Sequence, residues 1–314
     1  MAGIQRSVVV PSLASLLAAA LWASYYVIVL LAAPFVAPSA ILAYPFVVGG
    51  VAYLAFIAFR HEGAVFWASW RDPWSWIRTG FVLGMQVTVL ASTFLTGAVD
   101  TAIFALIGDV VVSPLLVMVL LGERRDRLRS LPFPLGLTLA MIGASLTIVG
   151  GQSIARVSGW GLVLAPLVPL MVAGFFMSAA HDSRSKPASV VVGNSMVAAG
   201  VIGIVIAPLI PGGIAGLRVT GFGPWSLILL LGLTSFFLAD VLFFWAIGKV
   251  GPLAPTTLMA AIPAFTLGFQ LVFLHEAPSD LSLIGIPIAV LGAALSLQGS
   301  HTSWAQVPGP PTDA

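Results

Sequence analysis

Two carboxylates lie inside long apolar stretches of the sequence, where an ionisable group is costly. Asp109 lies eight residues after Thr101 in one stretch, and Asp240 lies seven residues before Ile247 in another. An aspartate at the centre of a membrane helix costs about 2.5–3.5 kcal/mol on insertion scales, so it is usually protonated, paired or turned into the helix bundle. These two residues could therefore bind a proton for coupled transport, hold a cationic solute directly, or form a structural hydrogen bond to a neighbouring helix.

Aromatic and amide side chains in the other apolar stretches could line a pocket with these carboxylates. Trp22, Tyr25 and Tyr26 stand close together in the segment LWASYY. Aromatic rings with polar tips suit an amphipathic pocket, and they suit ordinary helix packing equally well. The remaining candidates for contact with a substrate or a coupling ion are Tyr44, Gln86, Asn194, Trp245 and Gln270.

The other residue types argue against several classes of function. The chain has no cysteine, and its four histidines lie at the ends of apolar stretches or in the C-terminal tail. We therefore expect no metal site, no cofactor and no cysteine nucleophile. The sequence also has no G-x-x-x-x-G-K-[ST] loop, the phosphate-binding signature of a nucleotide-driven pump. An enzyme is not expected.

The composition places these residues in a lipid bilayer. Of the 314 residues, 59% are hydrophobic and 8% are charged, and the mean hydropathy is +1.08. Soluble domains carry about 25% charged residues, so lipid must be the solvent of this chain. The basic residues lie between apolar segments rather than in one stripe, so a nucleic-acid partner is not expected.

Ten apolar runs are long enough to cross the bilayer, which takes about 20 helical residues. They are Leu13–Ala33, Ser39–Phe59, Ile77–Thr96, Thr101–Leu121, Leu131–Gly150, Trp160–Ala180, Ser189–Ile210, Trp225–Ile247, Pro252–Leu274 and Leu281–Gly299. The first run exceeds the roughly 7–15 apolar residues of a signal peptide, so we expect it to be retained. The fold class predicted is an all-α integral membrane protein with ten transmembrane helices.

The positive charges predict the orientation of these helices. With a cytoplasmic N-terminus, the connections on the cytoplasmic side carry eleven of the thirteen Lys and Arg residues, and the outer side carries only Arg156 and Arg218. Such a bias marks the cytoplasmic face. We therefore expect a multi-pass protein of the plasma membrane with both termini in the cytoplasm.

The segment 61–76 is rich in tryptophan. It carries Trp67, Trp70, Trp74 and Trp76. Tryptophan favours the headgroup region of a bilayer, so we expect this segment to be an interfacial anchor. A gate or a lipid sensor is the alternative.

The sequence repeats itself at a spacing of about 150 residues. LWASYY (21–26) aligns with MVAGFF (171–176), and the run that ends at Glu123 aligns with the run that ends at Glu276. Five helices is an odd number, so the two halves would cross the membrane in opposite senses. The loop ERRDRLR in the first half is basic, whereas its counterpart EAPSDLS is not, as an inverted repeat requires. We predict two inverted repeats, residues 1–155 and 156–299, followed by a disordered cytoplasmic tail, residues 300–314.

These motifs resemble the ten-helix EamA-type family of the drug/metabolite transporter superfamily. LWASYYV is similar to the family's first-helix pattern L-W-G-S-N-F-V, and VLLGERRDRL is similar to its fourth-helix ending l-l-G-E-r-l. FFWAIGKVGPLAPTTL is similar to its f-w-A-L-k segment. One departure is that the family's second-helix L-R-F is replaced by Tyr44-Pro45-Phe46, so a contact from that arginine to a substrate carboxylate would be absent.

The resemblance implies a secondary transporter, more often an exporter, of a small metabolite, amino acid or drug-like solute. Its mechanism would be alternating access around a site near the membrane midplane. The expected partners are the small-molecule substrate and the lipid bilayer. Proton coupling and a homodimer stay open, and the alternative function is a channel or a lipid-translocating protein without ion coupling.

Overall fold

The structure is a computed structural model that describes residues 2–107, 131–150, 167–182, 185–250 and 258–297, with the single residues 112, 164 and 255. In this described part the chain is helical, with no β-strand. The predicted all-α class is therefore confirmed for these residues.

Helices lie on all ten of the predicted apolar runs. In the first half these are α1 (Ala2–Ala32), α2 (Pro38–Phe59), α4 (Pro73–Thr96), α5 (Ala98–Ile107) and α7 (Pro132–Gly150), with the short α3 (Gly63–Ser69) between α2 and α4. The second half has α9 (Leu167–Asp182), α10 (Ala188–Ile206), α11 (Phe222–Leu233), α12 (Ala239–Val250), α14 (Ile262–Phe269) and α15 (Asp280–Leu297). Short 3-10 turns are η4 (Ala207–Leu209), η5 (Ala215–Leu217) and η7 (Met259–Ala261), and π-helical turns are η6 (Thr234–Leu238) and η8 (Gln270–Leu274).

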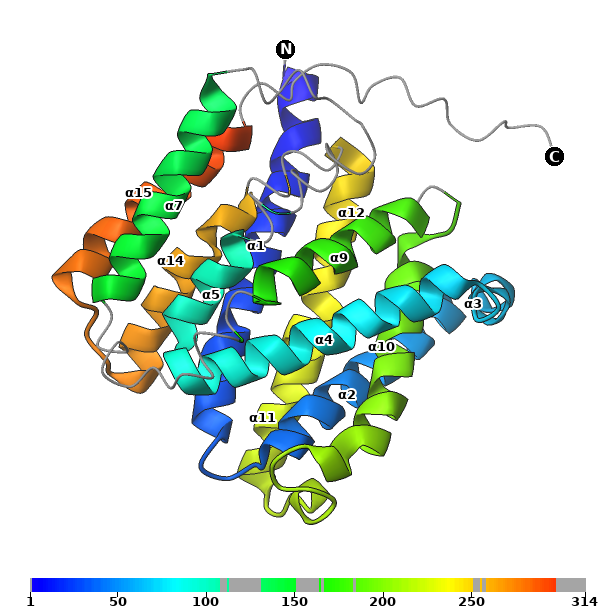
Figure 1. Ribbon diagram of the computed structural model, residues 1–314. Helices are drawn as coiled ribbons and strands as arrows, with labels where there is room; N and C mark the ends of the chain where they lie inside the picture. The colour runs from blue at the N-terminus through cyan, green and yellow to red at the C-terminus, as the bar shows by residue number, and fades with distance from the viewer. Residues whose placement is uncertain are drawn as a thin grey trace.

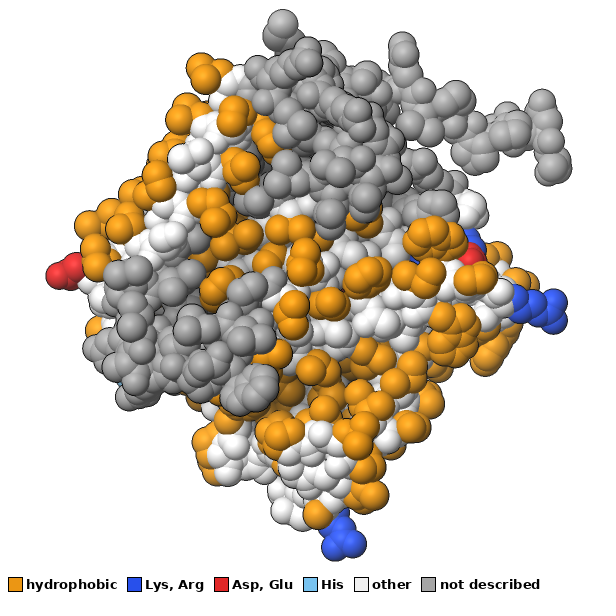
Figure 2. Space-filling model, viewed as in Figure 1, with side chains coloured by type: hydrophobic (Ala, Val, Ile, Leu, Met, Phe, Trp, Pro, Cys, Tyr) orange, Lys and Arg blue, Asp and Glu red, His pale blue; other side chains and the backbone are white. Residues whose placement is uncertain are grey.

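Five helical segments in the described part are long and apolar enough to cross a membrane. They are Val9–Ala32, Pro38–Phe59, Pro73–Thr96, Ala188–Leu209 and Phe222–Lys249. The space-filling view agrees with a lipid-facing exterior, because hydrophobic side chains cover much of the visible face and the visible Lys and Arg lie near its edges (Figure 2). The full set of ten crossings stays a prediction.

The third predicted run begins earlier than expected, and its N-terminal cap explains why. The run was predicted from Ile77, whereas α4 begins at Pro73. The Asp72 side chain accepts a hydrogen bond from the backbone N–H of Trp74 at 3.0 Å, and proline suits the first helical position. The helix ends at Gly97, whose φ of 101° is readily adopted only by glycine.

The tryptophan-rich segment covers α3 and the start of α4. Trp67, Trp74 and Trp76 are 69%, 42% and 49% exposed, whereas Trp70 is only partly exposed. Trp76 donates its indole N–H to the backbone carbonyl of Trp70 at 3.1 Å. Three exposed rings at one end of the bundle fit the predicted interfacial anchor, which stays a prediction.

Helices from the two halves pack against one another. The strongest pairs are α7 with α15, α2 with α10, α4 with α9, and α1 with α12. Figure 1 shows α7 and α15 side by side at one edge of the bundle, apart from the crossing of α4, α9 and α10. Small residues allow this close approach, as is usual between membrane helices.

The α7–α15 pair is held at backbone contact by glycines. A Cβ placed on Gly143 would lie 2.2 Å from the backbone nitrogen of Ala289, and one on Gly292 would lie 2.2 Å from that of Ala140. Because backbone atoms cannot rotate aside as a side chain can, these positions exclude every larger residue unless the helices separate.

We predict that Gly143→Ala lowers the free energy of unfolding by about 1–3 kcal/mol, as overpacking does. The measurement is the thermal midpoint of the purified chain in detergent. The matched control is Gly80→Ala on α4, where a Cβ meets nothing within 4 Å and helix propensity favours alanine. Equal midpoints for the two variants would contradict the close α7–α15 packing.

Candidate functional site

A cavity of about 110 Å³ lies in the interior of the helix bundle. Its lining consists of Trp22, Tyr25, Tyr26, Phe46, Met85, Gln86, Val89, Ala105, Val172, Phe175, Phe176, Met196, Ser235, Phe236, Asp240 and Ile262. These residues come from α1, α2, α4 and α5 in the first half and from α9, α10, η6, α12 and α14 in the second. The close pair α7 and α15 contributes none of them.

Twelve of the sixteen lining residues form pairs that are separated by 150 positions. The pairs are Trp22 and Val172, Tyr25 and Phe175, Tyr26 and Phe176, Phe46 and Met196, Met85 and Ser235, and Gln86 and Phe236. This separation is the spacing at which the sequence repeats. Each half of the chain therefore supplies matching positions to one shared cavity.

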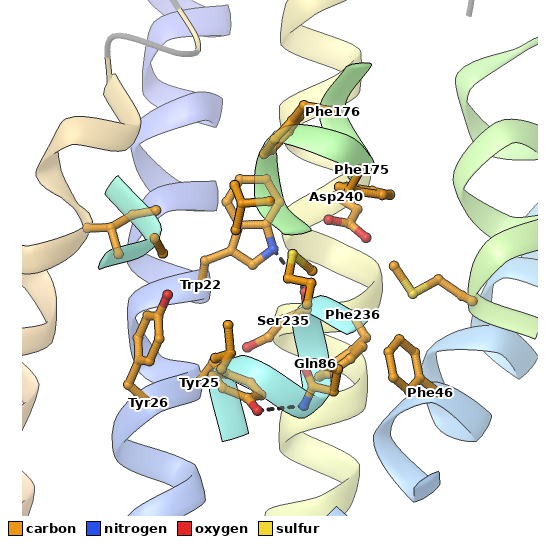
Figure 3. Close-up of a pocket in the computed structure, with 16 residues that line it drawn as sticks. Trp22, Tyr25, Tyr26, Phe46, Gln86, Phe175, Phe176, Ser235, Phe236 and Asp240 are labelled. Atoms are coloured by element: carbon orange, nitrogen blue, oxygen red, sulfur yellow. Dashed lines mark hydrogen bonds between the residues drawn. The ribbon is translucent and has the colours of Figure 1, made fainter. Parts of the chain in front are cut away.

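The members of these pairs differ in polarity. The first half places Tyr25, Tyr26 and Gln86 where the second half places three phenylalanines. Among the sixteen described lining residues the carboxylate comes from the second half alone, and Leu90 stands at the position 150 residues before Asp240. In the view of Figure 3, Tyr26 and Asp240 lie on opposite sides of the cavity. The two halves thus place residues at matching positions of the cavity, but these residues differ in polarity and charge.

The polar side of the cavity is held by a hydrogen bond between two helices. The Gln86 amide nitrogen on α4 donates to the Tyr25 hydroxyl on α1 at 2.5 Å (Figure 3). Gln86 is 3% exposed and Tyr25 is 5% exposed. Tyr25 also packs edge-on against Tyr26, with ring centroids 5.4 Å apart. A buried amide needs such a partner, so this bond fixes the positions of both side chains.

A second link joins α1 to the π-helical turn that precedes Asp240. Trp22 donates its indole N–H to the backbone carbonyl of Ser235 at 3.0 Å, and the Ser235 hydroxyl donates to the carbonyl of Leu21 at 2.9 Å. A π-turn changes the regular hydrogen-bond ladder of a helix, and such turns are frequent at functional sites. Here the turn docks against α1 and orients the first residues of α12.

Asp240 lies at the start of α12 and is 3% exposed. Its Oδ2 atom has no hydrogen-bond partner within the described part of the chain. None of the sixteen lining residues is a lysine, arginine or histidine. A buried carboxylate without a countercharge is costly, so this group must take up a proton or face a cation.

The aromatic walls around this carboxyl group are packed against one another. Phe46 and Phe236 meet edge to face with centroids 4.7 Å apart, and Phe176 lies 5.7 Å from Phe243 in the same manner. Trp22 also meets Phe243 edge to face, with centroids 5.1 Å apart. Interlocked rings of this kind hold a cavity open in a fixed shape.

The structure brings together five of the ten residues that the sequence suggested for a site. Asp240, Trp22, Tyr25, Tyr26 and Gln86 all line the cavity. Their roles in binding or coupling stay predictions. Asp109 lies outside the described residues.

The other four candidates lie away from the cavity lining, each with a different local role. The Tyr44 hydroxyl donates to the backbone carbonyl of Leu217 at 2.7 Å. The amide nitrogens of Asn194 and Gln270 donate to Ser69 at 3.0 Å and to Glu276 at 2.8 Å. Trp245 is 43% exposed on the outer face of the bundle. The rotation of each helix decides which face points inward, and the sequence does not reveal it.

Sequence reasoning left out much of the lining. Phe46, Met196, Ser235 and Phe236 were not considered for the site, and Phe175 and Phe176 were treated only as counterparts of the first-helix aromatics. The repeat could have found Phe175, Phe176 and Phe236, because each lies 150 positions from a candidate residue. Phe46 and Met196 pair with each other and Ser235 pairs with Met85, so the repeat gave no signal for them.

A buried ion-pair cluster joins the two halves away from this cavity. We use the term for Asp72, Arg78, Asp182 and Lys186. Arg78 on α4 is 0% exposed, and it pairs with Asp182 on α9 and donates to Ser195 on α10 at 2.8 Å. Lys186 pairs with Asp72 and lies 3.5 Å from Asp182. The cluster therefore ties α4 to α9 and α10.

The hydrogen bond from Lys186 lowers the pKa of Asp72, which lies just before α4. An acid whose pKa is lowered by folding stabilises the fold above its ordinary pKa. That contribution is lost as the pH falls through the lowered value. The link between Lys186 and Asp72 is therefore fully formed at neutral pH.

Comparisons with known proteins bear on the family and on the fold. Residues 159–298 match the EamA-like transporter family. A solved structure described as "Crystal structure of protein" is 20% identical, with a TM-score of 0.68 over 91% of this chain and 96% of that chain. That likeness shows the fold alone. No curated protein matches the chain. The family match, which covers less than half of the chain, confirms the resemblance to the drug/metabolite transporter superfamily. Together with the apolar helices it supports a multi-pass membrane protein.

We predict that Asp182→Asn lowers the free energy of unfolding by about 3–5 kcal/mol, because it leaves the buried Arg78 without its charged partner. The measurement is again the thermal midpoint in detergent. Arg60→Gln is the control, since Arg60 pairs with Glu62 at the surface, where a pair contributes about 1 kcal/mol or less.

The double variant Arg78→Met with Asp182→Leu removes both charges. It should recover much of the loss, because a well-packed apolar pair avoids the buried, unpaired charge. An Asp182→Asn variant as stable as Arg60→Gln would contradict the buried ion pair.

Proposed function

We propose that this membrane protein is a secondary active transporter that moves a small organic solute by alternating access, and that the cavity is its binding site. The observation that carries the proposal is the set of six lining pairs separated by 150 positions. In inverted-repeat transporters the substrate binds between the two repeats, where matching positions of both halves meet. A cavity built from such positions has the location that this mechanism requires.

The helix packing supports two inverted repeats, residues 1–155 and 156–299. If the halves are exchanged, α1 corresponds to α9, α2 to α10, α4 to α11 with α12, α5 to α14, and α7 to α15. If the two halves are related by symmetry, replacing each helix of a packed pair by its counterpart must give another packed pair. The pair α1–α12 becomes α9–α4, and both pairs are in contact. The pairs α2–α10, α5–α14 and α7–α15 each become themselves, and all three are in contact. The family match over residues 159–298 also falls on the second proposed repeat.

The ion-pair cluster suits a gate on the cytoplasmic side. Arg78 and Asp182 belong to different repeats, so any relative movement of the halves at this end must separate them. The orientation predicted from the positive charges has this end in the cytoplasm. The proposed cycle breaks the cluster when the cavity opens inward and forms it again when the cavity opens outward.

Asp240 is the proposed coupling residue. Its carboxyl group is buried in the cavity and Oδ2 is unpartnered within the described residues, so binding a proton or a solute there changes its free energy strongly. The proposal includes export from the cytoplasm across the plasma membrane. A channel or a lipid-translocating protein would instead give flux that does not saturate and does not depend on a proton gradient. The scheme assigns no role to Asp109 and does not require a homodimer.

The test is proton movement in proteoliposomes that contain a pH-sensitive dye, with a panel of amines, amino acids and nucleobases. We expect a saturable, solute-dependent pH change for the native chain. Asp240→Asn should reduce it about tenfold or more, because an amide cannot carry the proton.

The control is Asp280→Asn, which changes an exposed carboxylate at the start of α15 outside the cavity. It should leave the flux unchanged. Solute flux without a pH change in the native chain would overturn the coupling role of Asp240, as would an undiminished pH change in Asp240→Asn. Unsaturable flux would favour the channel.

A further inference from the structure

Among the described residues that line it, the cavity has one negative group and no positive one. Asp240 is the only carboxylate of these sixteen residues, and none of them is a lysine, arginine or histidine. Arg78, the fully buried arginine of the ion-pair cluster, lies outside the lining and is paired with Asp182. A solute that brings its own carboxylate would therefore meet a like charge and no partner. In a desolvated site that arrangement is unfavourable.

The walls beside Asp240 suit a positive charge. Trp22, Phe175, Phe176 and Phe236 present aromatic rings to the cavity (Figure 3). The face of an aromatic ring carries partial negative charge, and rings that surround a site attract an ammonium group, most strongly where water is excluded. The same rings accept the apolar body of a solute. The Asp240 carboxylate and the aromatic rings thus both favour a positively charged ligand.

The opposite side of the cavity adds a neutral polar contact. The Tyr25 hydroxyl accepts a hydrogen bond from Gln86, which leaves its own O–H proton available to donate. This side can orient a hydroxyl, ether or amide group of a solute but offers no full positive charge. It therefore cannot stand in for the cation that a substrate carboxylate would need.

We propose that the cavity selects organic ammonium cations without a carboxylate, with Asp240 as their counter-ion. The inference rests on the proposed function and names the substrate class of the same site. When a monovalent cation binds, Asp240 releases one proton to water, so the net charge of the site is unchanged. When the cation leaves, Asp240 takes the proton up again. Exchange of one proton for one cation is then electrically neutral.

Among the described residues, few other titratable groups can take part in this exchange. Tyr25 and Tyr26 share the cavity, and Tyr53 on α2 lies close enough to interact with Asp240 electrostatically. The lining residues from α4, α5, α9, α10 and α14 in the described part are not ionisable. Asp240 is therefore the group from which the exchanged proton comes.

The experiment is isothermal titration of the purified full chain at neutral pH with three solutes of nearly equal size. Phenethylamine is the cation, 2-phenylethanol replaces its ammonium group with a hydroxyl, and phenylalanine adds a carboxylate. We expect phenethylamine to bind about tenfold or more tightly than either of the others. Titration in two buffers of different ionisation enthalpy should show about one proton released for each amine bound.

Asp240→Asn should lose the preference for the amine, and Asp240→Glu should keep it. Thermal midpoints of both variants show that they are folded. Phenylalanine binding as tightly as phenethylamine overturns the proposal, as does an unchanged preference in Asp240→Asn. No binding of phenethylamine to the folded native chain overturns it as well. If the same preparation then transports an uncharged or zwitterionic solute, the proposed transport function stands without this substrate class.

Discussion

A carboxyl group buried in an apolar bundle without a countercharge is the constraint around which the interior is built. Asp240 is 3% exposed, and its Oδ2 atom has no partner among the described residues. A group in that position is stable only when it carries a proton or faces a cation. In one state Asp240 carries a proton, and in the other its carboxylate faces a cation. Exchange of the proton for a cation therefore changes the free energy of the site. The aromatic walls, the π-turn and the hydrogen bond between Tyr25 and Gln86 fix the space in which that exchange takes place.

The proposed duplication accounts for the shape of the cavity. Matching positions of the two halves supply most of the described lining, and the proposed two-fold relation makes them converge. The paired positions differ in chemistry, with hydroxyl and amide groups in the first half and phenylalanines in the second half, which also supplies the Asp240 carboxylate. A symmetric scaffold can move in two equivalent ways, and the asymmetric lining lets the bound solute and proton bias that movement.

The sequence predicted the helices well because hydropathy reports them directly. All ten apolar runs carry helices, but some boundaries differ: α1 begins at Ala2 rather than Leu13, and the cap at Asp72 starts α4 at Pro73 rather than Ile77. The site was predicted in part. Asp240 and Gln86 stood out because a polar group at membrane depth is unusual. Trp245 and Asn194 also carry a polar group within an apolar run. Trp245 nevertheless faces outward, and Asn194 donates a hydrogen bond to Ser69. Helix rotation separates these cases, and the sequence of a uniformly apolar helix carries little information about rotation.

The most direct test of the central claim is access to the cavity from both sides of the membrane. The chain has no cysteine, so Met196→Cys places one thiol in the lining. In sealed vesicles of known orientation, a membrane-impermeant maleimide is applied to each side in turn, with Arg71→Cys as a marker for one side. Alternating access predicts that the Met196→Cys thiol reacts from both sides and that a bound solute slows both reactions. Reaction from one side only, whatever solute is present, would contradict the account.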